Sequence, residues 1–264
     1  MVDYHIHTKL CGHASGEMSD YIVAALAQPL QEIGFADHLP MLKWAKPEYA
    51  MAFDQLPLYI KQVQRLQRLT PSLPIKLGIE ADYYSPSEES ATRDLLVRYP
   101  FDYVYGSVHL IDGWAIDDAR NLARWKEVGV DTIYERYFAQ LRLAAQSGLF
   151  DIMAHTDLAK KFQHKPTKDI SGIIEETIRT YKASGVAVEI NTSGMRKPAQ
   201  EIYPAPNIIR LLKDYDIPIV FGSDAHRPEE IGKDFSLART VAKACGHQEI
   251  VMFEHRQIVG TYRL

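Results

Sequence analysis

Short β-rich runs and longer helical patterns alternate along almost the whole chain, and this alternation limits the possible folds more than any other feature of the sequence. Parallel strands joined by helical crossovers produce such a pattern. The seven runs that read as strands are residues 2–6, 32–37, 74–80, 101–108, 150–155, 185–191 and 217–223. Because 264 residues suit one β/α barrel, we expect a single α/β domain of that kind.

Helical patterns fill the stretches between these strands. The 3.6-residue period is clearest in residues 130–148, where Tyr137 and Leu141 share one stripe. Pro29 ends the weakest pattern, residues 19–28, because proline lacks an N–H and its ring clashes with the preceding turn. The other helices are predicted at residues 54–70, 87–98, 168–184, 206–215 and 228–245. Three long connections that follow strands are predicted as loops, at residues 39–53, 110–127 and 192–205.

Composition and charge argue against several classes of protein. A net charge of −4 disfavours a protein that mainly neutralises a nucleic-acid backbone, so we expect a small-molecule partner and no nucleic acid. Two cysteines, Cys11 and Cys245, do not make a disulfide framework and favour a reduced, cytoplasmic compartment. The chain shows no secretion signal and no apolar run of about 18 residues, so we expect no membrane partner. The oligomeric state cannot be read from these features.

Histidines and acidic residues gather where the predicted strands end. Seven of the ten histidines lie at or just beyond the carboxyl end of a strand, and they are His5, His7, His13, His38, His109, His155 and His226. The acidic residues in equivalent places are Asp37, Glu80, Asp82, Asp157 and Asp224. Barrel enzymes carry their chemistry on this rim, so we expect these side chains to converge there.

Imidazole and carboxylate groups that converge on one rim predict a metal site. Residues i and i+2 of a strand point to the same side, so His5 and His7 can both face the barrel axis. The same holds for Asp224 and His226. A single histidine such as His109 is more often an ordinary core or surface residue than a ligand. A cluster of this size is hard to stabilise without a cation, and zinc, iron and manganese all suit its ligands.

Seven segments match motifs of a known family in their order along the chain. They are residues 3–8, 35–38, 78–82, 101–109, 155–158, 189–192 and 222–226. With these motifs the chain resembles the polymerase and histidinol phosphatase (PHP) family of metal-dependent phosphoesterases, and within it the monofunctional histidinol-phosphate phosphatases. The resemblance covers nearly the whole chain.

The resemblance implies a distorted (β/α)7 barrel, similar to a TIM barrel, in which residues 1–264 form one PHP-type domain. It also implies three divalent metal ions. By the family pattern, the first metal takes His5, His7, Glu80 and Asp224. The second shares Glu80 and adds His109 and His155, and the third takes His13, His38 and His226.

The activity implied by the resemblance is hydrolysis of L-histidinol phosphate to L-histidinol and phosphate, a step of histidine biosynthesis. A phosphate monoester dianion repels nucleophiles, so hydrolysis needs charge neutralisation and a hydroxide near neutral pH, and clustered divalent metals supply both. We expect a hydroxide that bridges the first two metals to attack phosphorus, with Glu80 and Asp224 among the ligands that carry this chemistry. The acid that protonates the leaving group is left open between Asp157, His38 and His226. Asp37, Asp82 and Asp157 can equally orient ligand imidazoles.

Basic residues on the same rim are candidates for phosphate contacts. They are Lys160, Lys161, Arg196 and Arg227. The family resemblance favours Lys161 and Arg196, although lysines and arginines are common on any surface. Lysine would act there as a point charge without the bidentate geometry of arginine.

Two other functions compete with the phosphatase. One is a PHP-family phosphodiesterase or nuclease that acts on nucleic-acid ends or oligonucleotides, and the acidic net charge counts against it. The other is a metal-binding scaffold without turnover, which a missing ligand would reveal. No family ligand position is missing from this sequence.

Overall fold

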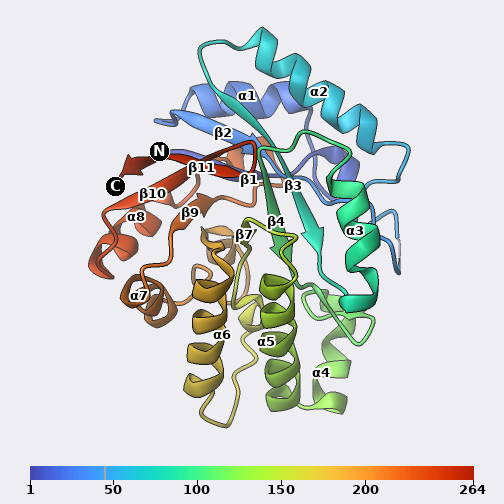
Figure 1. Cartoon of the computed structure of the whole chain (residues 1–264), viewed down its shortest axis with the longest axis vertical. Coiled ribbons are helices and arrows are strands. Elements are labelled where there is room, and N and C mark those ends of the chain that lie inside the picture. The colour runs from blue at the N-terminus through green and yellow to red at the C-terminus, as the bar shows by residue number, and fades with distance from the viewer. Residues whose placement is uncertain (45) are drawn as a thin grey trace.

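The structure is a computed structural model that describes residues 1–44 and 46–264, and seven parallel strands form its centre (Figure 1). The strands are Val2–Ile6 (β1), Glu32–Phe35 (β2), Ile75–Asp82 (β3), Tyr103–Ser107 (β4), Ile152–Met153 (β7), Ala187–Asn191 (β8) and Ile219–Gly222 (β9). They pair in chain order, and a bridge between Ile6 and Ala225 brings the last strand back to the first. The seven predicted strands and the distorted (β/α)7 barrel are therefore confirmed.

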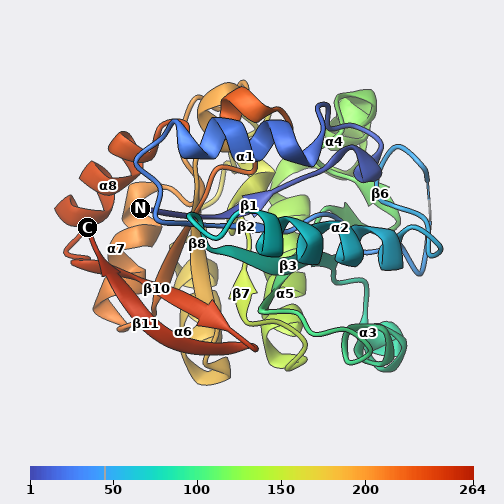
Figure 2. The same ribbon diagram turned by 90° about the horizontal axis from the view of Figure 1, so that it is seen from above.

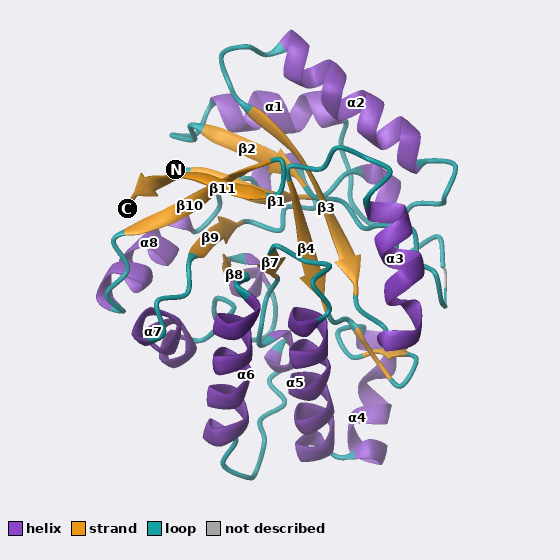
Figure 3. Ribbon diagram, viewed as in Figure 1, coloured by secondary structure: helices purple, strands orange, loops and turns teal. Residues whose placement is uncertain are grey.

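Helices surround this barrel (Figures 1, 2 and 3). They are Met18–Leu26 (α1), Leu56–Leu69 (α2), Glu89–Leu96 (α3), Leu122–Val128 (α4), Val130–Gln146 (α5), Ser171–Ser184 (α6), Pro206–Asp214 (α7) and Phe235–Ala244 (α8). Tyr137 and Leu141 on the inner face of α5 are completely buried, as the helical period predicted. No helix in the described part of the chain is long and apolar enough to span a membrane.

Two predicted segments differ from the structure. The helix predicted at residues 228–245 is interrupted, because Gly232 and Asp234 adopt positive φ angles of 60° and 62° that no α-helix tolerates. A short 3-10 turn, Pro228–Glu230, precedes the break, and α8 follows it. The connection predicted as a loop at residues 110–127 contains the two-stranded ribbon of Leu110–Ile111 (β5) and Trp114–Ala115 (β6), and then the start of α4.

An antiparallel hairpin, which the sequence analysis missed, covers the amino ends of the barrel strands (Figure 2). It consists of Glu249–Glu254 (β10) and Gln257–Arg263 (β11). The amide of Phe253 donates to the Tyr4 hydroxyl at 3.1 Å, and the amide of Arg256 donates to the Asp102 carbonyl at 2.8 Å. The hairpin thus closes one end of the barrel and leaves the other end for the long connections.

Candidate active site

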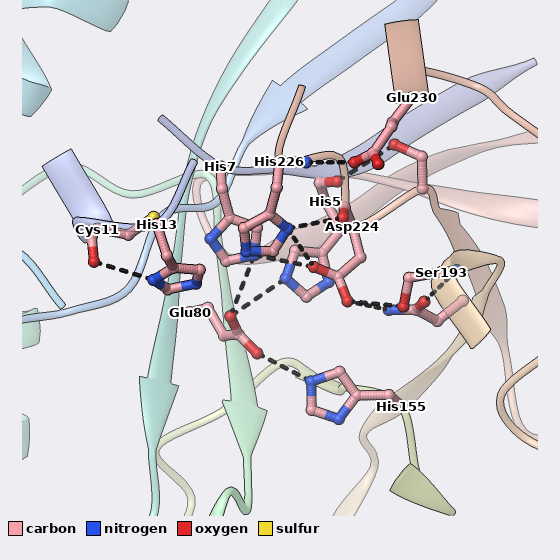
Figure 4. A network of polar contacts seen from close by, with 12 residues as sticks. His5, His7, Cys11, His13, Glu80, His155, Ser193, Asp224, His226 and Glu230 are labelled. Carbon is pink, nitrogen blue, oxygen red and sulfur yellow. Dashed lines mark hydrogen bonds and ion pairs between the residues drawn. The ribbon is translucent and has the colours of Figure 1, made fainter. Parts of the chain in front are cut away.

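Glu80, near the end of β3, lies at the centre of a cluster of histidines at the carboxyl end of the barrel (Figure 4). Its Oε2 atom lies 3.2 Å from His5 Nε2 and 3.1 Å from His38 Nδ1. Its Oε1 atom lies 3.1 Å from His155 Nε2 and 3.8 Å from His109 Nε2. One carboxylate thus faces imidazoles that come from four different segments of the chain.

Asp224 forms the second acidic centre, directly after β9. Its Oδ1 atom lies 3.1 Å from His7 Nε2. Its Oδ2 atom accepts hydrogen bonds from Ser193 Oγ at 3.0 Å and from Asn191 Nδ2 at 3.3 Å. The backbone of Asp224 is left-handed, with φ of 51°, an uncommon conformation that aspartate tolerates better than most residues. This turn places its carboxylate beside the histidines of β1.

Apart from His38, whose Nδ1 faces Glu80, four of the histidines have their Nδ1 atom against an oxygen acceptor, and this contact favours the tautomer with the lone pair on Nε2. His5 Nδ1 lies 2.6 Å from a Glu189 oxygen, and His109 Nδ1 lies 3.0 Å from an Asp82 oxygen. For His13 and His226 the acceptors are backbone carbonyls, at 3.1 Å and 3.0 Å. Nε2 is therefore the atom of these four rings that remains available to a metal ion.

Several buried atoms of this cluster have no hydrogen-bond partner, although they lie close together. They include His5 Nε2 and Glu80 Oε2, which face each other at 3.2 Å. An unsatisfied buried polar atom costs about 1–3 kcal/mol, and facing lone pairs on nitrogen and oxygen repel each other. A divalent cation bound between such atoms removes both penalties, and nitrogen and oxygen ligands of this kind suit zinc, iron or manganese. The residues present therefore fit a metal site.

Three-residue sets with ligand atoms within 4.8 Å of one another show where a cation would fit. One set joins His5, His7 and Glu80, and others join His38, Glu80 and His109, or His7, His38 and His226. Cys11 belongs to a further set with His13 and His226. The structure thus brings together the predicted ligands, and it places the Cys11 thiol beside them.

The carboxylates and imidazoles of the cluster shift one another's pKa values. Burial raises the pKa of the Glu80 carboxyl, but the facing imidazoles of His38 and His5 outweigh burial and hold this pKa well below its usual value. Burial lowers the pKa of His38 and His226 well below the usual value, and the neighbouring His7 lowers both further. Burial also lowers the pKa of His5 and His109, but neighbouring carboxylates outweigh burial and raise both pKa values above the usual one, so a metal ion that binds these rings must displace their protons.

A cavity of about 710 Å³ opens over the cluster, and three of the four predicted basic residues line it. These are Lys161, Arg196 and Arg227. The Lys161 ammonium lies 2.9 Å from an Asp117 oxygen, and the Arg196 guanidinium donates to the Ser223 carbonyl at 2.6 Å. Both cations are thus held at the wall of the cavity by neighbouring groups.

Lys160 and Asp157 are not among the residues that line this cavity. The Lys160 ammonium contacts Asp157 at 2.8 Å and Glu201 at 2.7 Å, and it donates to the Ile202 carbonyl at 2.8 Å. Asp157 also accepts from the amide of Ala205 at 2.9 Å. These contacts join two loops behind the cavity, whereas His38 and His226 face the cavity.

Lys197 and Glu189 are among the residues of the site that the sequence analysis missed. Lys197 lines the cavity with Lys161 and Arg196, and its position next to Arg196 in a long connection was the available signal. Glu189 was recognised only as part of a motif, but its carboxylate contacts His5 directly. An acidic residue inside an apolar strand was the signal for Glu189, since such a charge is rarely buried without a partner.

Known proteins similar to this chain span nearly all of it. The "Probable histidinol-phosphatase" of Deinococcus radiodurans is 38% identical over 259 residues, which cover 98% of each chain. The "Histidinol-phosphatase" of Bacillus subtilis is 28% identical, over 87% of this chain and 95% of that protein. The fold matches the crystal structure of histidinol phosphate phosphatase from Lactococcus lactis with a TM-score of 0.85 at 22% identity, over 97% of this chain and 98% of that one.

The sequence profiles of two related families match consecutive parts of the chain. The profile described as PHP-associated matches residues 207–242, which include α7 and most of α8. The profile described as PHP domain matches residues 3–193, which carry most of the histidine cluster. With this match and the Deinococcus relative, the resemblance seen in the motifs is confirmed, and the chain belongs to the PHP domain family.

Proposed function

We propose that this protein hydrolyses L-histidinol phosphate to L-histidinol and phosphate with the help of divalent metal ions. The observation that carries the proposal is the cluster of buried, unpaired ligand atoms around Glu80, which opens into a cavity lined by cations. The names of the full-length relatives point to the same reaction. The Lactococcus lactis structure is described as a complex with zinc, L-histidinol and phosphate, which supports both the metal and the substrate.

We assign the predicted ligands to three ions of zinc, iron or manganese. His5, His7, Glu80 and Asp224 would hold the first, Glu80 with His109 and His155 the second, and His13, His38 and His226 the third. Divalent ions at these places would lower the pKa of a bound water and neutralise the phosphoryl oxygens. The Nδ1 contacts of His5, His13, His109 and His226 support this assignment, since they leave Nε2 to the metal.

The phosphate group of the substrate would lie against Lys161 and Arg196, with Arg227 at the outer rim. Arg196 is held by the Ser223 carbonyl, so little side-chain freedom is lost when phosphate binds. Lys197 adds a further cation to this wall of the cavity. Lys160 is not part of this proposal, because it does not line the cavity and its ammonium contacts Asp157 and Glu201 instead.

The organic part of the substrate carries an amine and an imidazole, and another part of the cavity wall suits them. Glu48 and Asp118 line the cavity together with Tyr49 and Met41. Carboxylates attract an ammonium group, and the Tyr49 ring offers a face for an imidazole. The cavity therefore combines a cationic region for phosphate with an acidic and aromatic region for histidinol.

Among the candidates for protonating the leaving alkoxide we set Asp157 aside, and His38 and His226 can serve only while they do not bind the third metal. Both histidines face the cavity. The Asp157 carboxylate is only 5% exposed and is bound to Lys160 and to the Ala205 amide, so it lies out of reach of a substrate there. A general acid must come within hydrogen-bond distance of the atom that it protonates.

A panel of substrates tests the proposal. Phosphate release is measured with L-histidinol phosphate, with other small phosphomonoesters, with a phosphodiester and with an oligonucleotide. Each assay uses chelated protein and protein supplied with zinc, iron or manganese. We expect metal-dependent release that is fastest with L-histidinol phosphate. Preference for the diester or the oligonucleotide would replace the phosphatase by the nuclease alternative, and no release from any substrate would favour a scaffold.

A further inference from the structure

Glu189 places a completely buried carboxylate in the middle of the candidate metal site. It belongs to strand β8, and its side chain has no contact with solvent. One oxygen, Oε1, lies 2.6 Å from His5 Nδ1. The other, Oε2, accepts from the His155 amide at 3.0 Å and from Asn191 Nδ2 at 3.0 Å.

The contact with His5 decides which nitrogen of that ring can bind a metal. When Nδ1–H donates to Glu189, the lone pair lies on Nε2, and Nε2 faces Glu80 Oε2 at 3.2 Å. The His5 ring also stacks on Tyr105 with 4.6 Å between the centroids, so it is held on its edge and on its face. A carboxylate behind a ligand histidine fixes the ring and makes it a stronger donor.

The same carboxylate connects three further parts of the site. Its bond to the His155 amide fixes the backbone of a second predicted ligand, which follows β7. Asn191, which donates to Glu189, also donates to Asp224 Oδ2 at 3.3 Å. Glu189, on one strand, therefore orients predicted ligands from three other strands. It contacts His5 and His155 directly, and it reaches Asp224 through the Asn191 amide.

Gly222 leaves the space that this arrangement needs. A Cβ atom at this position would lie 1.9 Å from Glu189 Oε1 and 2.7 Å from the Cβ of His5. Contacts this short would push the carboxylate away from the imidazole. The pair of Glu189 and His5 thus depends on a glycine at the end of β9, more than 30 residues further along the chain than Glu189.

We propose that Glu189 is a positioning residue for the metal site: it sets the tautomer of His5, aligns His5 and Asp224 for the first cation, and holds the backbone of His155, which is assigned to the second. The proposal rests on the metal site of the proposed function, but not on its substrate. In this role Glu189 touches neither the metal nor the phosphate ester. Replacing Glu189 therefore weakens metal binding although every ligand side chain is still present.

Zinc binding separates this role from a purely structural one. Glu189→Gln keeps the size of the side chain and removes its charge. Asp102→Asn is the matched control, since Asp102 is also a buried carboxylate that accepts amide hydrogen bonds, from Leu77 and His255, but at the opposite end of the barrel. Each protein is freed of metal and titrated with Zn²⁺ in competition with a coloured chelator, and its thermal unfolding is followed with and without Zn²⁺.

We expect the affinity of the tightest zinc site to fall by about 10–100-fold in Glu189→Gln, the usual effect of losing a partner behind a metal ligand. The rise in unfolding temperature caused by zinc should shrink with it. Asp102→Asn should lower the unfolding temperature with and without zinc and keep the zinc affinity. Equal zinc affinity in Glu189→Gln and the natural protein would overturn the proposal, and so would an equal loss of zinc affinity in Asp102→Asn.

A second variant covers the case in which Glu189→Gln does not fold. Asn191→Ala keeps the contact between Glu189 and His5 but removes the link to Asp224, so it should bind zinc more weakly than the natural protein. An unchanged zinc affinity in Asn191→Ala would overturn the part of the proposal that concerns Asp224. Because no substrate is present in these titrations, a protein that binds zinc but releases no phosphate from histidinol phosphate would overturn the proposed function and not the role of Glu189.

Discussion

Both ends of the barrel bury charged and polar side chains, but these groups are hydrogen-bonded at the amino end and partly unpaired at the carboxyl end. At the amino end, the Tyr4 hydroxyl donates to the Glu32 carboxylate and accepts from the Phe253 amide at 3.1 Å. The Asp102 carboxylate accepts from the amides of Leu77 and His255, at 2.8 Å and 3.3 Å. The C-terminal hairpin supplies two of these amides, so this end is closed and its polar groups are paired.

At the carboxyl end, the polar groups that line the site are left partly unpaired. His5 Nε2 and Glu80 Oε2 lack a hydrogen bond although they are only 3.2 Å apart. Hydrogen bonds at the amino end contribute only to folding stability. Unpaired polar groups at the carboxyl end lower this stability until a cation binds. The comparison teaches that the unpaired state of buried groups, and not their burial or charge, distinguishes the site from the closed end.

The largest effect on activity is expected when the central carboxylate of the site is changed. Glu80→Gln removes a charge that faces several imidazoles, so turnover should fall by more than about 100-fold, beyond the loss typical of a partner behind a ligand. Metal content, measured by elemental analysis, should fall with it. Normal turnover at normal metal content would show that the unpaired end does not work as a metal site.

A smaller effect, on the Michaelis constant, is expected when a cation is removed from the wall of the cavity. Lys161→Ala removes one charged contact to phosphate, worth about 1.5–3 kcal/mol, and should raise the Michaelis constant for histidinol phosphate by about tenfold or more. Lys160→Ala is the matched neighbour, and it should leave the Michaelis constant unchanged because Lys160 lies outside the cavity lining. Steady-state kinetics measures both variants. Equal changes in the Michaelis constant would contradict the assignment of Lys161 to phosphate binding.

We expect pH to change the inhibition constant of inorganic phosphate by a few-fold. Burial lowers the pKa of the Lys197 ammonium below its usual value, and the charge of Lys161 lowers it further, so Lys197 loses its proton at a lower pH than an exposed lysine. Inhibition by inorganic phosphate should therefore weaken with rising pH before the range in which an exposed lysine loses its proton. Lys197→Arg keeps its charge throughout this range and should flatten the rise of the inhibition constant. The same pH profile in both proteins would exclude Lys197 from phosphate binding.

No effect on activity is expected at the closed end, and this prediction tests the comparison from the other side. Tyr4→Phe leaves the Glu32 carboxylate and the Phe253 amide without their partner, so the free energy of unfolding should fall by about 1–3 kcal/mol. Denaturant unfolding measures this loss, and a zinc titration should show unchanged affinity. A fall in zinc affinity would mean that the two ends of the barrel are coupled.

Strands were easier to predict from the sequence than the segments that follow them. Short apolar runs and alternation with helices are local signals, so all seven barrel strands were found, although β7 proved to be only Ile152–Met153. The break at Gly232 and the C-terminal hairpin were missed. Helical residues flank Gly232 on both sides and mask the break, and the hairpin is held by contacts with Tyr4 and Asp102, which are remote in the sequence.

Two adjacent lysines show a feature that local sequence patterns do not predict. Lys160 and Lys161 are adjacent, yet the 3-10 turn Leu158–Lys160 directs one ammonium to Asp157 and the other to the cavity. The sequence shows two equal lysines. A turn of one or two residues decides their directions, and no periodic pattern reports such a turn.

The amino-acid pattern was sufficient to identify the barrel and the set of candidate ligands, because strand alternation and strand ends depend on neighbours along the chain. It was not sufficient to identify the orientation of those ligands. The contact between His5 and Glu189 joins residues 184 positions apart, and the space for it is left by Gly222. Such a contact exists only once the barrel has closed, since closure of β1 against β9 brings these three residues together.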